Sequence, residues 1–304
     1  MDLIVNNTAT SHDDIRQRHR LLGRLLIEAD KLSERDVQKI LKRQQKLGCR
    51  FGEAAVALGK VKRADVLTAL SVQFDYPLFE GSEHLDARLT LACDPFSARA
   101  EGVRELRNQL QLRWFAQSKS LLTVCSAHAR ESCSEVAANL ALAFAQTGTQ
   151  TLLIDADLRQ SDMHKLFALP GGRGLSDILA RKYSMQECLK TCLGFEHFSL
   201  LPAGTPPPNP LELLNRPTFA ELLLEATARY DVILLNTPPT LDYADAQMIA
   251  SLTGAALLIA RHNFSRIGDI RRVQRQFGDI GIHLLGAAYI DCQNSSSKRI
   301  GPSA

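Results

Sequence analysis

The sequence predicts a doubly wound α/β domain with a mostly parallel sheet, preceded by a small all-helical domain. Continuous apolar runs alternate with helical stretches from residue 121 onward, a pattern typical of parallel strands buried on both faces. An internal repeat with an offset of 29 residues lies before this region. A length of 304 residues exceeds one typical domain, so two folded units with a connector are expected. The expected parts are a disordered N-terminus (1–17), a helical two-repeat domain (18–78), a linker (79–100), the α/β domain (101–292) and a flexible tail (293–304).

Strands and helices are expected in alternating order through the α/β domain. Because doubly wound sheets bind ligands at the carboxyl ends of their strands, any site is expected there. A rigid proline-rich loop is predicted at 206–210. The predicted strands are 121–125, 151–154, 198–204, 232–235, 255–259 and 284–290, and the predicted helices are one beginning near Glu101 and those at 136–145, 163–167, 174–179 and 217–228.

Composition excludes several function classes. A net charge of +3, without a basic tract or an aromatic platform, does not favour nucleic-acid binding. The seven cysteines form neither a C-x-x-C pair nor a cluster at zinc spacing, which indicates reduced thiols. The sequence has no secretory leader and no apolar run long enough to span a bilayer. We therefore expect a cytoplasmic protein.

The stretch 121–159 has the layout of a phosphate-binding loop: a buried strand, a loop over 126–134, a helix and a second strand ending in Asp155. Such a loop needs glycines that let backbone N–H groups close around phosphate, a lysine for the β- and γ-phosphates, and a Ser or Thr for magnesium. Ser134 stands at the magnesium position. Arg130 and Ser132 replace glycines, however, and Cys133 replaces the lysine. The loop therefore has the expected position between strand and helix, but it lacks most of the residues that bind phosphate.

Several further motifs, in order, resemble the tyrosine autokinases of bacterial polysaccharide export, the BY-kinases, within the deviant-Walker ATPases that include MinD and ParA. The resemblance covers roughly residues 101–291 and implies a P-loop NTPase fold. The motifs are Glu101-x-x-Arg104-x-x-Arg107, Ile154-Asp155-Ala156-Asp157-Leu158-Arg159, Gly174-Leu175-Ser176-Asp177, Leu201-Pro202-Ala203-Gly204 with Pro207-Pro208-Asn209-Pro210, and Val232-Ile233-Leu234-Leu235-Asn236-Thr237-Pro238-Pro239.

The resemblance implies an ATP and magnesium site that is degenerate here. It assigns Asp155 and Asp157 to the catalytic acidic motif, with helix capping as the alternative, and Ser134 and Asp155 to magnesium. Asn236 stands where the family has a carboxylate that holds magnesium. Losing the lysine and this carboxylate removes roughly 3–6 kcal/mol of contacts to charged groups; Arg130 or Arg159 supplying substitute charge is the alternative. The implied nucleotide-site residues are Ala127, Arg130, Ser132, Cys133, Ser134, Glu135, Arg159 and Asn236.

The family pattern also implies partners. Glu101, Arg104 and Arg107 share one helix face, which in BY-kinases packs one subunit against the next, so a homo-oligomer is expected. Autokinases of this family carry a C-terminal tyrosine cluster, and none of the five tyrosines here lies in the tail. We therefore expect a pseudokinase that regulates or scaffolds exopolysaccharide biosynthesis and export, recruited by an inner-membrane polysaccharide co-polymerase. An active kinase or ATPase with an atypical loop, and a MinD-like positioning module, are the alternatives.

The N-terminal repeat resembles the N-terminal domain of type II secretion and type IV pilus ATPases, one version of which binds cyclic di-GMP. That version begins each repeat with Arg-Leu-Gly. The second repeat fits this pattern with Arg50 and Gly52, whereas Leu21 stands at the arginine position of the first repeat. The resemblance thus implies one good half-site for cyclic di-GMP. The alternative is a helical docking module whose glycines permit close packing.

Overall fold

A computed structural model describes residues 22–74, 79, 84–192 and 194–291. The chain divides into two compact units, Met1–Leu78 and Phe79–Ala304, each with its own core. In the first unit residues 22–28 are helical, and three further helices follow. They are α2 (Glu34–Leu47), α3 (Phe51–Ala57) and α4 (Arg63–Phe74).

The 29-residue repeat appears in the first unit as reciprocal ion pairs. Lys31 of the first repeat contacts Asp65 of the second at 3.2 Å, and Lys60 of the second contacts Asp36 of the first at 2.8 Å. Hydrogen bonding to the Lys60 ammonium lowers the pKa of Asp36 well below its ordinary value. The two repeats therefore exchange equivalent contacts.

The repeat glycines lie where helices approach closely. A Cβ on Gly52 would lie 2.6 Å from Val66 Cγ1, and one on Gly23 would lie 3.4 Å from Val37 Cγ1. Gly52 is therefore required for packing within its own repeat, whether or not it contacts a ligand.

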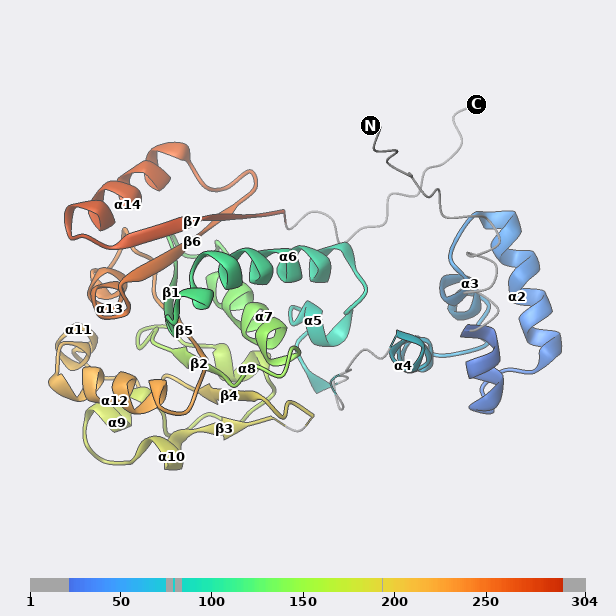
Figure 1. The fold of residues 1–304 in the computed structure, drawn as a ribbon, viewed down its shortest axis with the longest axis horizontal. Coiled ribbons are helices and arrows are strands. Elements are labelled where there is room, and N and C mark those ends of the chain that lie inside the picture. Colours follow the sequence, from blue (N-terminus) through green and yellow to red (C-terminus); the bar gives the residue numbers. More distant parts are fainter. Residues whose placement is uncertain (1–21, 75–78, 80–83, 193, 292–304) are drawn as a thin grey trace, which may run out of the picture. The chain divides into compact units, whose positions relative to one another are not determined.

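The second unit is built on a seven-stranded sheet in the order β3-β4-β2-β5-β1-β6-β7, parallel except for the short antiparallel β3 (Figure 1). The central strands are short apolar runs with almost every side chain buried, as expected when helices cover both faces. The strands are β1 (Leu121–Ser126), β2 (Thr151–Asp155), β3 (Lys190–Thr191), β4 (Phe198–Leu201), β5 (Val232–Asn236), β6 (Ala255–Arg261) and β7 (His283–Ile290).

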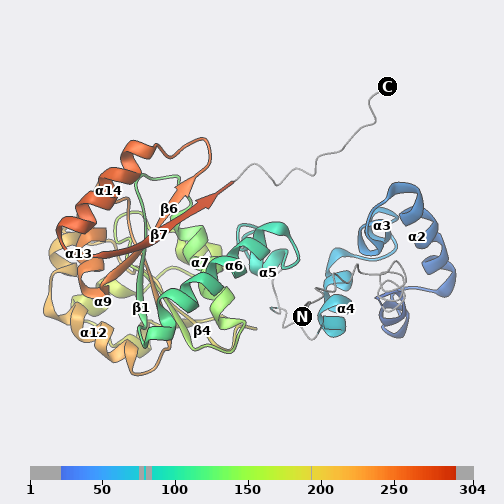
Figure 2. The same cartoon turned by 45° about the horizontal axis from the view of Figure 1, so that its top comes forward.

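Helices cover both faces of the sheet. A first group of helices covers one face of the sheet and packs on alternate residues of the strands. A second group covers the other face and packs on the intervening residues (Figure 2). The first group is α5 (Thr90–Cys93), α6 (Ala98–Arg113), the 3-10 turn η2 (Phe115–Gln117), α7 (Cys133–Ala145) and α8 (Met163–Leu166); the second is α9 (Leu175–Leu179), α10 (Met185–Cys188), α11 (Pro210–Leu214), α12 (Pro217–Thr227), α13 (Asp245–Thr253) and α14 (Ile267–Asp279). The predicted doubly wound α/β fold with a mostly parallel sheet is confirmed.

The connector predicted over 79–100 is instead ordered structure where it is described. Leu89 and Leu91 are fully buried in the core of the second unit, and α6 begins at Ala98 rather than near Glu101. The buried amide of Asn139 on α7 fixes the segment: its Oδ1 accepts from the backbone N–H of Leu91 at 3.0 Å, and its Nδ2 donates to the carbonyl oxygen of Arg88 at 2.8 Å.

The prediction that 284–290 forms a strand buried on both faces is wrong in its burial. Strand β7 is the sheet edge and pairs with β6 alone among the described strands. Its side chains are exposed or half-buried, with Tyr289 67% exposed. An apolar run predicts a strand, but the position of that strand in the sheet decides its burial. Among the described helices, none has both the length and the apolar character needed to cross a membrane.

Candidate functional site

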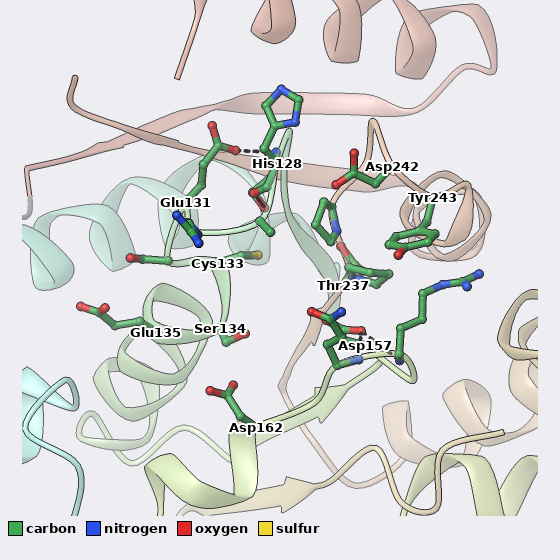
Figure 3. Close-up of a pocket in the computed structure, with 18 of the residues that line it drawn as sticks. His128, Glu131, Cys133, Ser134, Glu135, Asp157, Asp162, Thr237, Asp242 and Tyr243 are labelled. Carbon is green, nitrogen blue, oxygen red and sulfur yellow. Dashed lines mark hydrogen bonds between the residues drawn. The ribbon is translucent and has the colours of Figure 1, made fainter. Parts of the chain in front are cut away.

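A cavity of about 400 Å³ opens at the carboxyl ends of β1, β2 and β5, where the fold class places ligand sites (Figure 3). Its described lining contains four arginines against five carboxylates, and no lysine. The lining residues are Arg88, Ser126, His128, Ala129, Arg130, Glu131, Ser132, Cys133, Ser134, Glu135, Asp157, Arg159, Gln160, Asp162, Thr237, Pro238, Pro239, Asp242, Tyr243 and Arg261.

The loop between β1 and α7 keeps a glycine-type backbone without glycines. Arg130 has φ 70° and Ser132 has φ 60°, both in the left-handed region. For a residue with a Cβ this conformation costs roughly 1–2 kcal/mol. Both substituted positions thus retain the backbone conformation that glycine would adopt readily.

Cys133 is the first residue of α7 and is buried beneath the loop. Its Sγ donates to the carbonyl oxygen of Val124 at 3.4 Å. Burial raises the pKa of the Cys133 thiol well above its ordinary value, so the side chain is neutral near pH 7. The position that carries the lysine of a working loop therefore supplies no positive charge.

Glu131 holds the loop from within. Its side chain is almost fully buried, and Oε2 accepts the backbone N–H of His128 at 2.9 Å (Figure 3). Oε1 accepts from the hydroxyl of Ser265, which follows β6. The carboxylate thus joins two turns of backbone that are far apart in sequence.

Two further contacts join the loop to the end of β6 and to the first turn of α14. Arg261 Nη1 donates to the carbonyl oxygen of Arg130 at 2.8 Å. His128 Nε2 lies 3.1 Å from Oδ2 of Asp269 in the first turn of α14. Side chains from β6 and α14 therefore hold the loop in place.

Asp155 ends β2 beneath the cavity and is fully buried. Burial raises its pKa to about 7, although hydrogen bonds from the Ser161 hydroxyl and from Asn236 Nδ2, at 2.9 Å, favour the charged form. Asn236 Oδ1 is buried without a hydrogen-bond partner among the described residues. The amide of Asn236 therefore donates its hydrogen bond to Asp155, and it adds no negative charge to the site.

Asp157 lies on the cavity wall two residues beyond Asp155. Its Oδ1 accepts the backbone N–H groups of Arg159 and Gln160, each at 3.0 Å. This is an Asx turn within a loop and not the helix cap considered as the alternative, because the next helix, α8, begins only at Met163. Burial raises the pKa of Asp157 despite those hydrogen bonds.

Arg159 reaches the cavity but is committed to another partner. It donates through Nε and Nη2 to both oxygens of Asp245, at 2.8 and 2.9 Å, and Asp245 is fully buried. Its guanidinium carbon lies 4.1 Å from the centre of the Tyr243 ring. The pair raises the pKa of Arg159 and compensates its charge.

Glu135 and Arg88 line the side of the cavity next to α5. Arg99 contacts Glu135 at 2.5 Å, and desolvation raises the pKa of Glu135 in spite of that cation. Arg88 forms a two-pronged hydrogen bond with Asp86 at 3.0 and 2.9 Å. Sequence reasoning missed Arg88 because it lies in the segment taken for a connector.

The structure brings most of the predicted site residues together. Ala127 is buried behind the loop, and Asp155 and Asn236 lie beneath the cavity rather than in its wall. Of the residues missed by sequence reasoning, His128 and Glu131 lie in the phosphate loop at positions where the motif requires no particular residue type, and the others lie outside the recognised motifs. Those lining the cavity as predicted are Arg130, Ser132, Cys133, Ser134, Glu135, Asp157 and Arg159; those missed are Arg88, His128, Glu131, Asp162, Asp242, Tyr243 and Arg261.

The predicted interface residues lie on α6, away from this cavity. Arg104 contacts Glu101 at 2.9 Å and donates to the carbonyl oxygen of Pro95, and Arg107 donates to the carbonyl oxygen of Ala143 at 3.0 Å. Glu101 is the exposed member, with 63% of its side chain accessible. Their role between subunits stays a prediction.

Comparison with known proteins places this geometry in a family. Tyrosine-protein kinase YwqD of Bacillus subtilis is 34% identical over 194 residues, which cover 64% of this chain and 81% of YwqD. The chain belongs to the bacterial tyrosine kinase family. Tyrosine-protein kinase wzc of Salmonella typhi is 33% identical over 200 residues. The match covers 66% of this chain but only 28% of that relative.

Solved structures agree with the family assignment. The kinase domain of Escherichia coli tyrosine kinase ETK superposes with a TM-score of 0.64 at 29% identity, covering 70% of this chain and 84% of that domain. No protein-family model matches the chain. The family is therefore established by individual relatives and by the fold.

Proposed function

We propose that this family member is a pseudokinase, a degenerate tyrosine autokinase homologue that acts as a regulatory or scaffold subunit in exopolysaccharide biosynthesis and export. The observation that carries the proposal is Cys133. A neutral, buried thiol, hydrogen-bonded to the carbonyl oxygen of Val124, occupies the position from which a lysine reaches phosphate. Losing one charged contact of this kind removes about 1.5–3 kcal/mol, which is roughly a ten- to a hundredfold loss of affinity.

The acidic residues support the same conclusion. A magnesium site needs ionised carboxylates. Asp155 has its pKa raised to about 7 and is bonded to Asn236, which stands where the family has a second carboxylate. We infer that the residues present do not fit a magnesium nucleotide.

Substitute cations are the strongest argument for an active enzyme. Arg159 is neutralised by its two hydrogen bonds to Asp245. Arg130 lines the cavity, but its side chain is exposed to solvent, which screens its charge. In addition, the carboxylates of the cavity outnumber its arginines, which disfavours a polyanion such as ATP. These features favour the inactive form over an atypical kinase or ATPase.

A scaffold role requires partners. In keeping with the family resemblance, we propose recruitment to the inner membrane by a polysaccharide co-polymerase, and self-association through the α6 face that carries Glu101. The chain spans 28% of the length of tyrosine-protein kinase wzc.

Two experiments test the proposal. Incubation with labelled ATP and magnesium should give no phosphotyrosine, and stoichiometric labelling that disappears in Asp155→Ala would overturn it. In a strain from which the gene is deleted, an Asp155→Asn allele should restore polysaccharide export as well as the wild-type allele does. Asp155→Asn keeps the shape of the side chain, so a failure to restore export despite normal protein levels would indicate an active enzyme.

A further inference from the structure

The outer side of α14 and the turn before it carry four exposed arginines beside exposed apolar side chains. Phe264 is 42% exposed and Ile267 is 68% exposed. None of the four arginines forms an ion pair with another residue in the described part of the chain. We call this surface the α14 arginine face: Phe264, Arg266, Ile267, Arg271, Arg272 and Arg275.

The face follows from the helix register. Val273 and Phe277 are fully buried against the sheet, which turns the opposite side of α14 outward. Ile267, Arg271 and Arg275 are spaced by four residues and therefore form one row along that side. Figures 1 and 2 show α14 at the outside of the second unit.

The charge of the face is not balanced locally. Asp269, the acidic residue of the first turn, is turned to His128 of the phosphate loop at 3.1 Å. Asp279 is the other acidic residue of α14 and lies at its far end. Four cations thus stand together in water with one carboxylate near the end of their row.

We propose that the α14 arginine face binds an anionic lipid surface. Arginines with neighbouring aromatic and aliphatic side chains match a membrane interface, where guanidinium groups meet lipid phosphates and apolar groups enter the headgroup boundary. The basic row of α2 provides a contrast: Arg35, Lys39, Lys42 and Lys46 are exposed too, but the exposed apolar side chain of α2, Leu47, stands at the very end of the helix, beyond the row.

The α14 arginine face lies next to the candidate site, because the turn between β6 and α14 contributes to both. Arg261 and Ser265, on either side of Phe264, hold the phosphate loop at Arg130 and Glu131. A membrane bound at Phe264 and Ile267 would therefore lie next to side chains that fix the loop. The inference does not depend on whether the loop binds nucleotide.

The test is co-sedimentation of the full chain with vesicles of phosphatidylcholine alone or with about one-third phosphatidylglycerol. The wild type should bind the anionic vesicles and not the neutral ones. Each arginine near an anionic surface contributes about fivefold in affinity. Arg271→Glu with Arg275→Glu should therefore weaken binding by at least about 25-fold, and Ile267→Ser by a few-fold.

The matched control is Lys39→Glu with Lys42→Glu, which changes the net charge equally on α2 and should retain most of the binding. Because all these residues are exposed, unfolding curves of the variants should match that of the wild type, which separates lost binding from lost folding. Equal binding to both vesicle types, or unchanged binding by the α14 variant, would overturn the proposal. So would a wild type that ignores both vesicles, which would make an acidic protein the better partner.

Discussion

Replacing Asp155 by asparagine should stabilise the second unit at neutral and alkaline pH. The carboxyl is fully buried, and its pKa is raised from 3.8 to about 7. An asparagine can keep both contacts, with Oδ1 accepting from Asn236 and Nδ2 donating to the Ser161 oxygen. The substitution therefore removes an ionisation without removing the network.

The size and sign of the effect follow from the shift. A raised carboxyl pKa means that the folded state holds the proton more tightly than the unfolded state. The stabilising contribution is fully present below about pH 4, falls as pH rises, and is lost by about pH 7. A shift of about 3 pKa units corresponds to about 4 kcal/mol. The stability advantage of Asp155→Asn over the wild type should grow by about that amount across this range.

The assay is urea unfolding followed by tryptophan fluorescence. Trp114 is the single tryptophan of the sequence and is buried in the second unit, so the signal reports that unit alone. Taking the difference between variants cancels the other titrating groups. Asp242→Asn is the control, because Asp242 is exposed on the rim of the same cavity and its variant should follow the wild type at every pH. A constant difference between Asp155→Asn and wild type from pH 4 to 8 would refute the reasoning.

Three other outcomes are expected. Ser132→Gly should stabilise the second unit by about 0.5–1 kcal/mol in the same urea assay, because φ 60° is strained for serine and not for glycine; a loss of stability would contradict this. Glu101→Lys should shift the wild-type oligomer toward monomer in light scattering while Glu196→Lys does not, and a wild type that is monomeric at tens of micromolar excludes the α6 interface. In calorimetry with cyclic di-GMP, Arg50→Ala should abolish binding and Leu21→Arg should tighten it about tenfold. The reason is that arginine can pair with guanine or phosphate and leucine cannot. If neither the wild type nor either variant gives binding heat, the repeat is a docking module.

The structure does not test the prediction that the repeat binds cyclic di-GMP. Leu21 lies outside the described residues, whereas Arg50 is exposed at the start of α3. Gly52 packs against Val66, so its presence is explained without a ligand. The repeat itself was visible in the sequence, but the reciprocal pairs Lys31–Asp65 and Lys60–Asp36 were not, because they join residues whose spacing differs from the repeat.

The α/β fold was predictable because its strands are continuous apolar runs in the centre of the sheet. Burial of β7 was not, since an edge strand has the same local sequence as a central one. The order of residues 84–100 was also hidden, because it depends on the Asn139 amide, 48 positions from Leu91. The same amide also donates to the carbonyl oxygen of Arg88, whose side chain lines the cavity.

The sequence predicted many of the residues that line the site, but it did not predict the contacts that these residues make. Replacement of the lysine by Cys133 is readable from the loop, but the direction of its Sγ toward Val124 depends on the strand beneath. In the same way, Arg159 was a candidate cation until its pairing with Asp245, 86 positions away, was known. Charge compensation between distant residues has no signature in one sequence.

Calorimetric titration of the full chain with ATP and with ADP, each with and without magnesium, tests the central claim most directly. If the site is degenerate, magnesium should not increase the heat of either nucleotide, and Ser134→Ala should behave as the wild type does. Tight binding that requires magnesium and is lost in Ser134→Ala would show a working nucleotide site and contradict the account.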